Sequence, residues 1–172
     1  TGAMYRAIGL YTSKVGVEAN DRQRVPELLP HIHLELGFID GVQHIFLNGE
    51  DVSGQIRTED ASKRASDVSA IPEVRAFLLE FQRSFAKSNN VLMDGRDIGT
   101  VVLPDAELKI FLTASADARA QRRYLEQKAK GMDVTYEQVL EAMRQRDLQD
   151  STRAAAPLKP ADDAVFVDST DM

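Results

Sequence analysis

The run Val91-Leu92-Met93-Asp94-Gly95-Arg96-Asp97-Ile98-Gly99-Thr100 decides the fold class that we expect for this chain. Three apolar residues are followed at once by charged residues and glycines, as where a buried parallel strand ends at a functional edge of a sheet. The glycines let the backbone turn sharply and let a ligand approach closely. Asp94 and Asp97 could orient a sugar hydroxyl, a metal-bound water or a phosphate clamp around Arg96. The alternative is a tight turn held by an Asp–Arg pair.

Two more apolar segments after this run have the length of buried strands. They are Leu108 to Leu112 and Ala164 to Val167, and the second ends at Asp168. Helical patterns at 116–130 and 136–148 lie between them, where Gly131 ends the first helix and Thr135 caps the second. Strands that alternate with helices predict a three-layer α/β fold with a parallel sheet.

The first half of the chain predicts helices that are interrupted by a small antiparallel insert. A helix over 1–17 is followed by a short helix or loop at Pro26 and Pro30. Residues 31–38 alternate between apolar and polar, the Asp40-Gly41 pair predicts a hairpin turn, and 42–47 supply the returning strand. A second turn is expected at Asn48-Gly49.

Two helices are predicted to follow this insert. Thr58 has the character of an N-cap for a helix to about Val68, and Pro72 opens a longer helix to about Lys87. The longer helix has apolar residues at helical spacing, namely Val74, Phe77, Leu78, Phe81 and Phe85.

Composition excludes several classes of protein. The chain of 172 residues is 43% hydrophobic and 28% charged, which fits one globular domain. Without cysteine it can form neither a disulfide framework nor a thiolate metal site. The sequence has no run of 18 apolar residues and no signal segment, so we expect a cytoplasmic protein with no membrane partner. His31, His33 and His44 on the predicted hairpin are expected to be structural.

The charge of the chain favours a small anionic ligand over a polymer. A formal net charge of −6 argues against a nucleic-acid binder, and the basic and aromatic residues are not interleaved as RNA binding would require. Arginine nonetheless supplies 14 of the 21 cationic side chains. Its planar guanidinium suits bidentate binding of phosphate or carboxylate oxygens.

Two clusters of charged residues are candidates for anion binding. Arg119, Arg122 and Arg123 share one helix face, where like charges repel unless an anion such as a triphosphate offsets them. Nearby Glu126 is the alternative source of neutralisation. Arg146, Asp150 and Arg153 lie at i, i+4 and i+7, so a carboxylate could hold two arginines ready for an anion. A surface ladder of ion pairs has the same spacing.

Arg6 and Arg75 are further candidates because of where they fall. Each lies in the opening part of a predicted helix, where the helix dipole favours an anion and repels a cation. An arginine there needs another reason for its position. Ser66 and Ser69, which precede Pro72, could be ordinary caps.

The same residues resemble the bacterial cytidylate kinase family along essentially the whole chain. Thr1 to Arg6 are similar to the segment after that family's first Asp, and Gly49 to Gly54 with Ile56-Arg57-Thr58 resemble its nucleotide-binding insert. Asp94 to Val102 are similar to the family's most recognisable run. The remaining matches are Ala65-Ser66, Pro72 to Arg75, Arg146-Asp147, Asp150, Arg153, Ala156-Pro157-Leu158 and Asp168-Ser169-Thr170.

The resemblance implies a P-loop nucleoside monophosphate kinase that moves the γ-phosphoryl of ATP, with Mg²⁺, to CMP or dCMP. It implies one domain with a core of residues 1–30, 88–115 and 154–172, an acceptor-binding insert of 31–87 and a lid of 116–153. The parent kinase that the resemblance implies is expected to act as a monomer. By this resemblance the CMP site comprises Thr1, Tyr5, Arg6, Ser66, Arg75, Asp97, Arg146, Asp150 and Arg153.

The resemblance also assigns roles within that set. Ser66, Arg75 and Asp150 are expected near the cytosine and its arginine clamp, and Asp97 near the sugar. Arg119, Arg122 and Arg123 are expected to close on the ATP phosphates. Arg123, Arg153 and Asp97 are the candidates for catalysis.

One feature of the family's pattern is absent from these 172 residues. They contain no Gly-x-x-x-x-Gly-Lys-Ser/Thr element, whose backbone amides and lysine cradle the phosphates of ATP. In the family this element and the first core strand come before the point that matches Thr1, and a terminal helix follows the point that matches Thr170. We therefore expect this chain to be inactive by itself, and to be marginally stable or self-associating. The alternatives are a kinase for UMP or AMP, and a nucleotide-binding module without chemistry.

Overall fold

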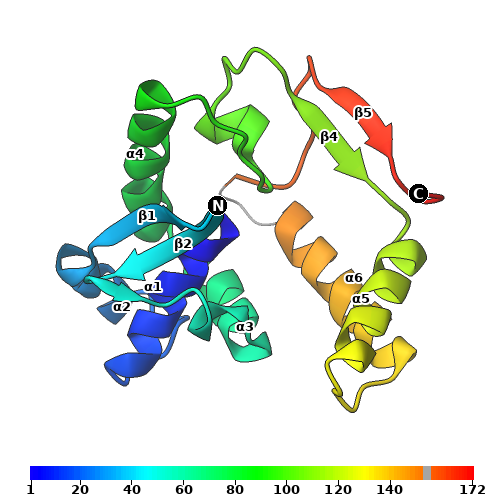
Figure 1. The fold of residues 1–172 in the computed structure, drawn as a ribbon, viewed down its shortest axis with the longest axis horizontal. Coiled ribbons are helices and arrows are strands. Elements are labelled where there is room, and N and C mark those ends of the chain that lie inside the picture. Colours follow the sequence, from blue (N-terminus) through cyan, green and yellow to red (C-terminus); the bar gives the residue numbers. More distant parts are fainter. Residues whose placement is uncertain (153–155) are drawn as a thin grey trace. The chain divides into compact units, whose positions relative to one another are not determined.

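The computed structural model describes residues 1–152 and 156–172 (Figure 1). These residues form two compact units, 1–95 and 96–172. The first unit contains α1 (Gly2–Lys14), α2 (Arg24–Leu28), η1 (Leu29–His31), β1 (Leu34–Ile39), β2 (Val42–Leu47), β3 (Glu50–Asp51), η2 (Gln55–Arg57), α3 (Glu59–Ser69) and α4 (Pro72–Ser88). The second contains η3 (Ile98–Val102), β4 (Ile110–Thr113), α5 (Ala116–Ala129), α6 (Tyr136–Thr152) and β5 (Val165–Asp168).

The core of the first unit lies among α1, α3, α4 and the antiparallel sheet. Ile8 of α1, Val68 of α3 and Leu78 of α4 are completely buried, and Leu34 and Ile45 of the sheet join the same cluster. The helices therefore cover one face of the sheet with the apolar residues that their periodicity predicted.

The antiparallel insert is confirmed in detail. Asp40 and Gly41 have φ values of 51° and 78° between β1 and β2, and Asn48 and Gly49 have 52° and 83° between β2 and β3. Positive φ at both central residues is the geometry of the tight two-residue hairpin turn that Asp-Gly and Asn-Gly favour. The strand order is β1-β2-β3, so β1 is an edge strand.

The helix caps predicted from the sequence are also present. The Thr58 hydroxyl accepts a hydrogen bond from the Ala61 amide at 3.1 Å, and Pro72 begins α4. In the second unit, the Thr135 hydroxyl accepts from the Gln138 amide at 3.2 Å while the Gln138 side chain accepts from the Thr135 amide at 2.9 Å. This reciprocal pair is a capping box, and it starts α6.

The second unit contains the parallel sheet that the sequence predicted, with two strands. β4 and β5 pair in parallel, with Ile110 opposite Val165 and Thr113 opposite Asp168. The sheet carries apolar side chains that are not covered, since Leu112 is 68% exposed and Phe166 63%. A parallel sheet is ordinarily covered on both faces, so this one has an unusual amount of exposed apolar surface.

The predicted strand at Val91–Met93 is wrong. These residues form no strand in the described chain, and Leu92 is fully exposed. A strand needs a neighbouring strand for its backbone hydrogen bonds, and here β4 and β5 pair only with each other. The described residues therefore form an α/β protein with one parallel and one small antiparallel sheet.

Candidate functional site

A carboxylate held between arginines is the most developed cluster of the second unit. The Asp150 carboxylate accepts from Arg96 Nε at 3.0 Å, and Arg146 Nε lies 3.9 Å from the same oxygen. The Asp150 side chain is only 8% exposed, whereas both arginine side chains are nearly half exposed. Burial lowers the pKa of Arg146, the positive charge of Arg96 lowers it further, and Asp150 opposes both effects. Asp150 thus holds two like charges close together, which suits the binding of an anion.

Asp97 lies directly before an unusual turn of helix. Its carbonyl accepts from the amides of Val101 at 2.9 Å and Val102 at 3.2 Å, and Leu103 donates to the Ile98 carbonyl at 2.7 Å. Bonds from residue i to i+5 define a π-type turn, which is frequent at functional sites. Asp97 itself is buried. The Asp-Gly-Arg-Asp run therefore leads into a fixed turn.

Arg119 is held by a partner that the sequence did not indicate. Its two terminal nitrogens donate to the two carboxylate oxygens of Asp147 at 3.0 and 2.6 Å, and its Nε donates to the Ala114 carbonyl at 3.0 Å. The pair joins α5 to α6 in the bidentate geometry that arginine favours.

The other two arginines of α5 also have partners within the second unit. Arg122 donates to the hydroxyl and the carbonyl of Ser169 and to the Thr170 carbonyl, just after β5. Arg123 donates to Glu126 at 2.8 Å, the neutralising residue that the sequence offered as an alternative. All three arginines therefore already contact oxygen atoms of the protein.

In the first unit, Arg75 lies over an aromatic ring. Its guanidinium carbon is 5.8 Å from the centre of the Tyr5 ring, and its Nη1 donates to the Ser69 carbonyl at 3.2 Å. Ser66 lies in the same helix as Ser69, and its carbonyl accepts from the Ser69 hydroxyl at 2.8 Å. The structure therefore brings together Tyr5, Ser66 and Arg75.

Thr1 and Arg6 attach the N-terminal part of α1 to other segments of the first unit. Arg6 donates to the Ile56 carbonyl at 2.9 Å, which gives this arginine a structural reason for its place in the first turns of the helix. The Thr1 hydroxyl donates to the Asp94 carbonyl at 2.7 Å. The expected CMP residues are thus divided between two groups, one in each unit, and Arg153 lies outside the described residues.

Two residues of these clusters were not assigned to the nucleotide sites from the sequence. Arg96 is the nearest arginine to Asp150, and Asp147 is the partner of Arg119. Arg96 could have been chosen from the run that contains it. Asp147 lies 28 positions from Arg119, and no spacing rule connects the two.

Two of the histidines contact carboxylates of the antiparallel sheet. His33 Nε2 lies 2.8 Å from Glu35, and His44 Nδ1 lies 2.6 Å from Asp51. His44 stands opposite Gly37 in the strand register. No group of three metal-ligating side chains occurs in the described part of the chain.

The low pKa of Asp51 predicts a pH dependence of stability that can be tested. Hydrogen bonds from the hydroxyl and amide of Ser53, with a smaller contribution from His44, lower the pKa of Asp51 from 3.8 to about 2. Because the folded pKa is below the unfolded value, this stabilisation is complete above pH 3.8 and is lost as the pH falls through about 2. We expect an NMR titration of the Asp51 carboxyl to have a midpoint near this lower value. Replacing Ser53 by alanine should raise the midpoint toward 3.8, and an unchanged midpoint would contradict this assignment.

The two groups of side chains and the two sheets define an α/β protein that carries arginine–carboxylate clusters suited to anions. Comparison with known proteins makes the assignment specific. The family model for cytidylate kinase matches residues 1–172. The chain belongs to the cytidylate kinase family.

Individual relatives agree with that family along the entire chain. A cytidylate kinase of Caldicellulosiruptor bescii is 52% identical over 172 residues, and one of Pseudomonas aeruginosa strain LESB58 is 49% identical over 174. One of Pasteurella multocida is 45% identical over 172 residues. In each case the match covers 100% of this chain and 76% of the relative. Among the described helices, none has the length and apolar character needed to span a membrane.

Proposed function

We propose that this protein transfers the γ-phosphoryl group of ATP to CMP or dCMP, giving CDP or dCDP and ADP. The observation that carries the proposal is the family match over residues 1–172. In the reaction an oxygen of the CMP α-phosphate forms a bond to the γ-phosphorus of ATP. The bond from that phosphorus to the β,γ-bridging oxygen breaks, and ADP leaves with its electron pair. Such a transfer depends on positioning and charge neutralisation.

The acceptor nucleotide is assigned to the two groups of side chains described above. Arg96 and Arg146, held by Asp150, offer two guanidinium groups to an anion of the nucleotide. Ser66 and Arg75 are proposed for the cytosine, together with the Asp150 cluster, and Asp97 for the sugar. Tyr5 is proposed to fix the Arg75 guanidinium through the ring contact at 5.8 Å. Thr1, Arg6 and Arg153 complete the proposed set.

The donor phosphates are assigned to the three arginines of α5. Arg119 and Arg123 have protein carboxylates as partners, at 2.6 Å from Asp147 and 2.8 Å from Glu126. A phosphate would therefore have to share these arginines with the carboxylates or displace them. Arg123 is the candidate to reach the transferring group, because its partner lies on its own helix and is nearly half exposed. Such surface pairs cost little to break.

Mg²⁺ is the metal that ATP would bring to such a site. No cluster of three metal-ligating side chains occurs among the described residues. We therefore assign no ligand to the metal, and the proposed roles above rest on the arginines and Asp150. The cytoplasmic location and the monomeric state expected from the sequence stay predictions.

We propose that β4, β5 and the flanking helices are part of a P-loop NTPase-like sheet. The polypeptide of 172 residues has no phosphate-cradling Gly-x-x-x-x-Gly-Lys-Ser/Thr element. We expect it to bind the acceptor nucleotide without turning over, because the β- and γ-phosphates lack that cradle.

Calorimetric titration of the chain with CMP, UMP and AMP tests the acceptor assignment. Saturable binding of CMP ahead of the other two is the expected result. A chain with Ser66, Arg75 and Asp150 all replaced by alanine should lose the preference for CMP over UMP. Equal binding of the three nucleotides by the unmodified chain would leave only a general anion cluster and would contradict the assignment.

A coupled ATPase assay separates a kinase from a binding module. The comparison is between the chain alone and a chimera in which the phosphate-binding segment of a relative precedes Thr1. CMP-dependent formation of ADP by the chimera, and none by the chain alone, is expected. A chimera that is folded and binds CMP but forms no ADP would favour a module without chemistry.

A further inference from the structure

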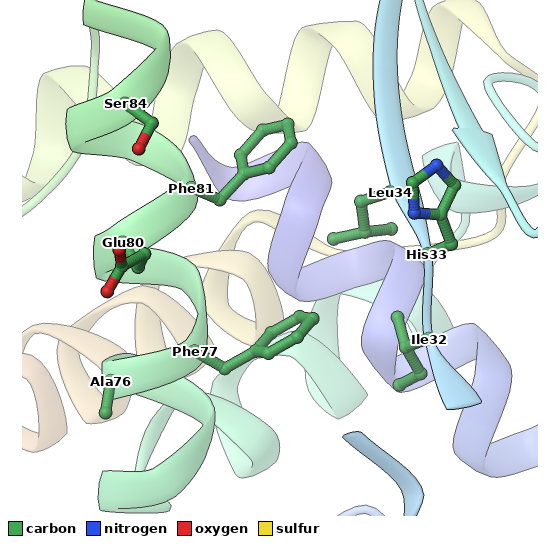
Figure 2. Close-up of a pocket in the computed structure, with 8 residues that line it drawn as sticks. All are labelled: Ile32, His33, Leu34, Ala76, Phe77, Glu80, Phe81 and Ser84. Atoms are coloured by element: carbon green, nitrogen blue, oxygen red, sulfur yellow. The ribbon is translucent and has the colours of Figure 1, made fainter. Parts of the chain in front are cut away.

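A groove in the first unit is lined by residues that the proposed reaction does not use. It has a volume of about 570 Å³ and lies between the start of β1 and one face of α4. Figure 2 shows Phe77 and Phe81 projecting from α4 toward Ile32 and Leu34. These four apolar side chains form its walls, and Ala76, Glu80, Ser84 and His33 complete the lining. The groove is therefore apolar inside and polar at its rim.

The groove is bordered by a strand that has no neighbour on its outer edge among the described residues. β1 is at the end of the three-stranded order, so one side of its backbone faces away from β2. The hydrogen bonds of β2 show which residues of β1 direct their backbone N–H and C=O groups outward. Ile45 stands opposite Leu36, but its amide donates to the Ser53 hydroxyl and its carbonyl accepts from Val52. Leu36 consequently directs its own N–H and C=O to the outer side.

The same alternation applies to the rest of β1. The His33 carbonyl accepts from the Asn48 amide at 2.8 Å, so His33 faces β2 and its neighbour Leu34 faces outward. Leu34, Leu36 and Phe38 thus present an unpaired row of backbone donors and acceptors that begins at the groove. Phe38 is 70% exposed, which extends the apolar surface along the strand.

The charges around this edge are acidic. The Glu80 carboxylate is exposed and lines the groove. Glu35 of β1 is exposed and lies 2.8 Å from the His33 ring. A ligand that carries basic side chains would therefore be favoured over an acidic one.

We propose that the outer edge of β1 binds an extended segment of a partner protein, in which apolar and basic residues alternate. The backbone of the segment would pair with Leu34, Leu36 and Phe38 as an added strand. One apolar side chain of the segment would enter the groove between Phe77 and Phe81, and the basic side chains would lie on the opposite face of the added strand, beside Glu35. Strand addition of this kind takes affinity from main-chain hydrogen bonds and specificity from a side-chain pocket.

A second copy of the chain is a less suitable occupant. Antiparallel pairing of β1 with the β1 of another copy would bring the same carboxylates, Glu35 and Asp40, to both sides of the contact. Like charges across neighbouring strands destabilise their pairing. A basic segment has no such repulsion.

The test uses the full chain and a synthetic probe, an acetylated and amidated peptide of alternating lysine with valine or phenylalanine. Two further probes carry N-methyl groups on alternate amides, one set in each peptide. Only one alternate set of amides can face β1, so we expect one methylated probe to bind like the parent and the other to lose binding. NMR amide shifts should change at Leu34, Leu36 and Phe38.

Charge variants provide the matched control. Glu35→Lys should weaken binding of the lysine probe about tenfold, a change worth about 1.4 kcal/mol. Glu73→Lys makes the same charge change in the first turn of α4, at a residue that does not line the groove, and should leave binding nearly unchanged. Equal weakening by both variants, or equal binding of both methylated probes, would overturn the proposal. So would a concentration-dependent dimer whose contacts occupy β1, because a second copy would then be the occupant.

Discussion

A chain with alanine in place of Asp150 is expected to bind CMP about 30- to 100-fold more weakly and to remain folded. Asp150 is 8% exposed in its side chain and compensates the charges of Arg96 and Arg146. Its removal leaves two guanidinium groups in mutual repulsion, in a place where burial already lowers the pKa of Arg146. Breaking a buried ion pair costs about 3–5 kcal/mol. The arginines are nearly half exposed, so the cost to folding stability is smaller here. The expected loss of CMP affinity corresponds to about 2–3 kcal/mol, because the two guanidinium groups are no longer held in position for the anion.

Titration of the Asp150→Ala chain with CMP measures this loss directly. Asp150→Asn keeps the size of the side chain and removes its charge, so it should fall close to the alanine variant if charge is decisive. Glu141→Ala is the control, because Glu141 is an exposed carboxylate of α6 whose described partner is the neutral side chain of Gln145. An Asp150→Ala chain that is folded and binds CMP with unchanged affinity would remove Asp150 and its arginines from the acceptor site.

The largest effect on stability is expected from Leu78→Ala. Leu78 is completely buried in α4 and belongs to the core cluster with Ile8 of α1 and Val68 of α3. Truncation would remove buried apolar surface and leave a cavity among elements that cannot fully close it. The expected loss of unfolding free energy is about 2–5 kcal/mol.

Urea unfolding followed by circular dichroism measures this loss of stability. Leu148→Ala is the matched control, because Leu148 is 64% exposed on α6 and its truncation should change the free energy by less than about 0.5 kcal/mol. Equal losses for the two variants would mean that the core does not lie where the structure places it.

Local signals predicted most of the secondary structure. The two turns of the hairpin, the Thr58 and Thr135 caps and the start of α4 at Pro72 are each determined by residues within a few positions of one another. Such features depend on backbone preference and short-range hydrogen bonds. They can therefore be predicted without knowledge of the rest of the fold.

Features that depend on distant partners could not be predicted in this way. Val91 to Met93 have the composition of a strand, but a strand also requires a neighbour, and the sequence does not say which segment that is. Gln82 lies on the buried side of α4 and its amide contacts Met4 Sδ at 3.8 Å, although its polarity predicts exposure. Asp147 belongs to the same group, because its contact with Arg119 depends on how α5 and α6 pack.

Spacing in the sequence predicted some of the side-chain contacts in the candidate site and not others. Arg146 and Asp150 share a face of α6, as their spacing required, and Arg75 meets Tyr5, a residue of the same proposed set. The protein oxygens around Arg119 and Arg122 could not be derived from composition, because they come from segments far away in the sequence. Charge clustering thus identified the arginines but not the groups that restrain them.

The exposed two-stranded sheet has a consequence for the local dynamics of the second unit. Among the described strands, β4 and β5 pair only with each other, and the side chains of Leu112 and Phe166 are exposed to water. Hydrogen exchange there should proceed through small local openings, with modest protection factors. Amides in the middle of α1, above a fully buried Ile8, should exchange only through much larger openings. Deuterium uptake would then follow two separate time scales along one chain, with β4 and β5 labelled first.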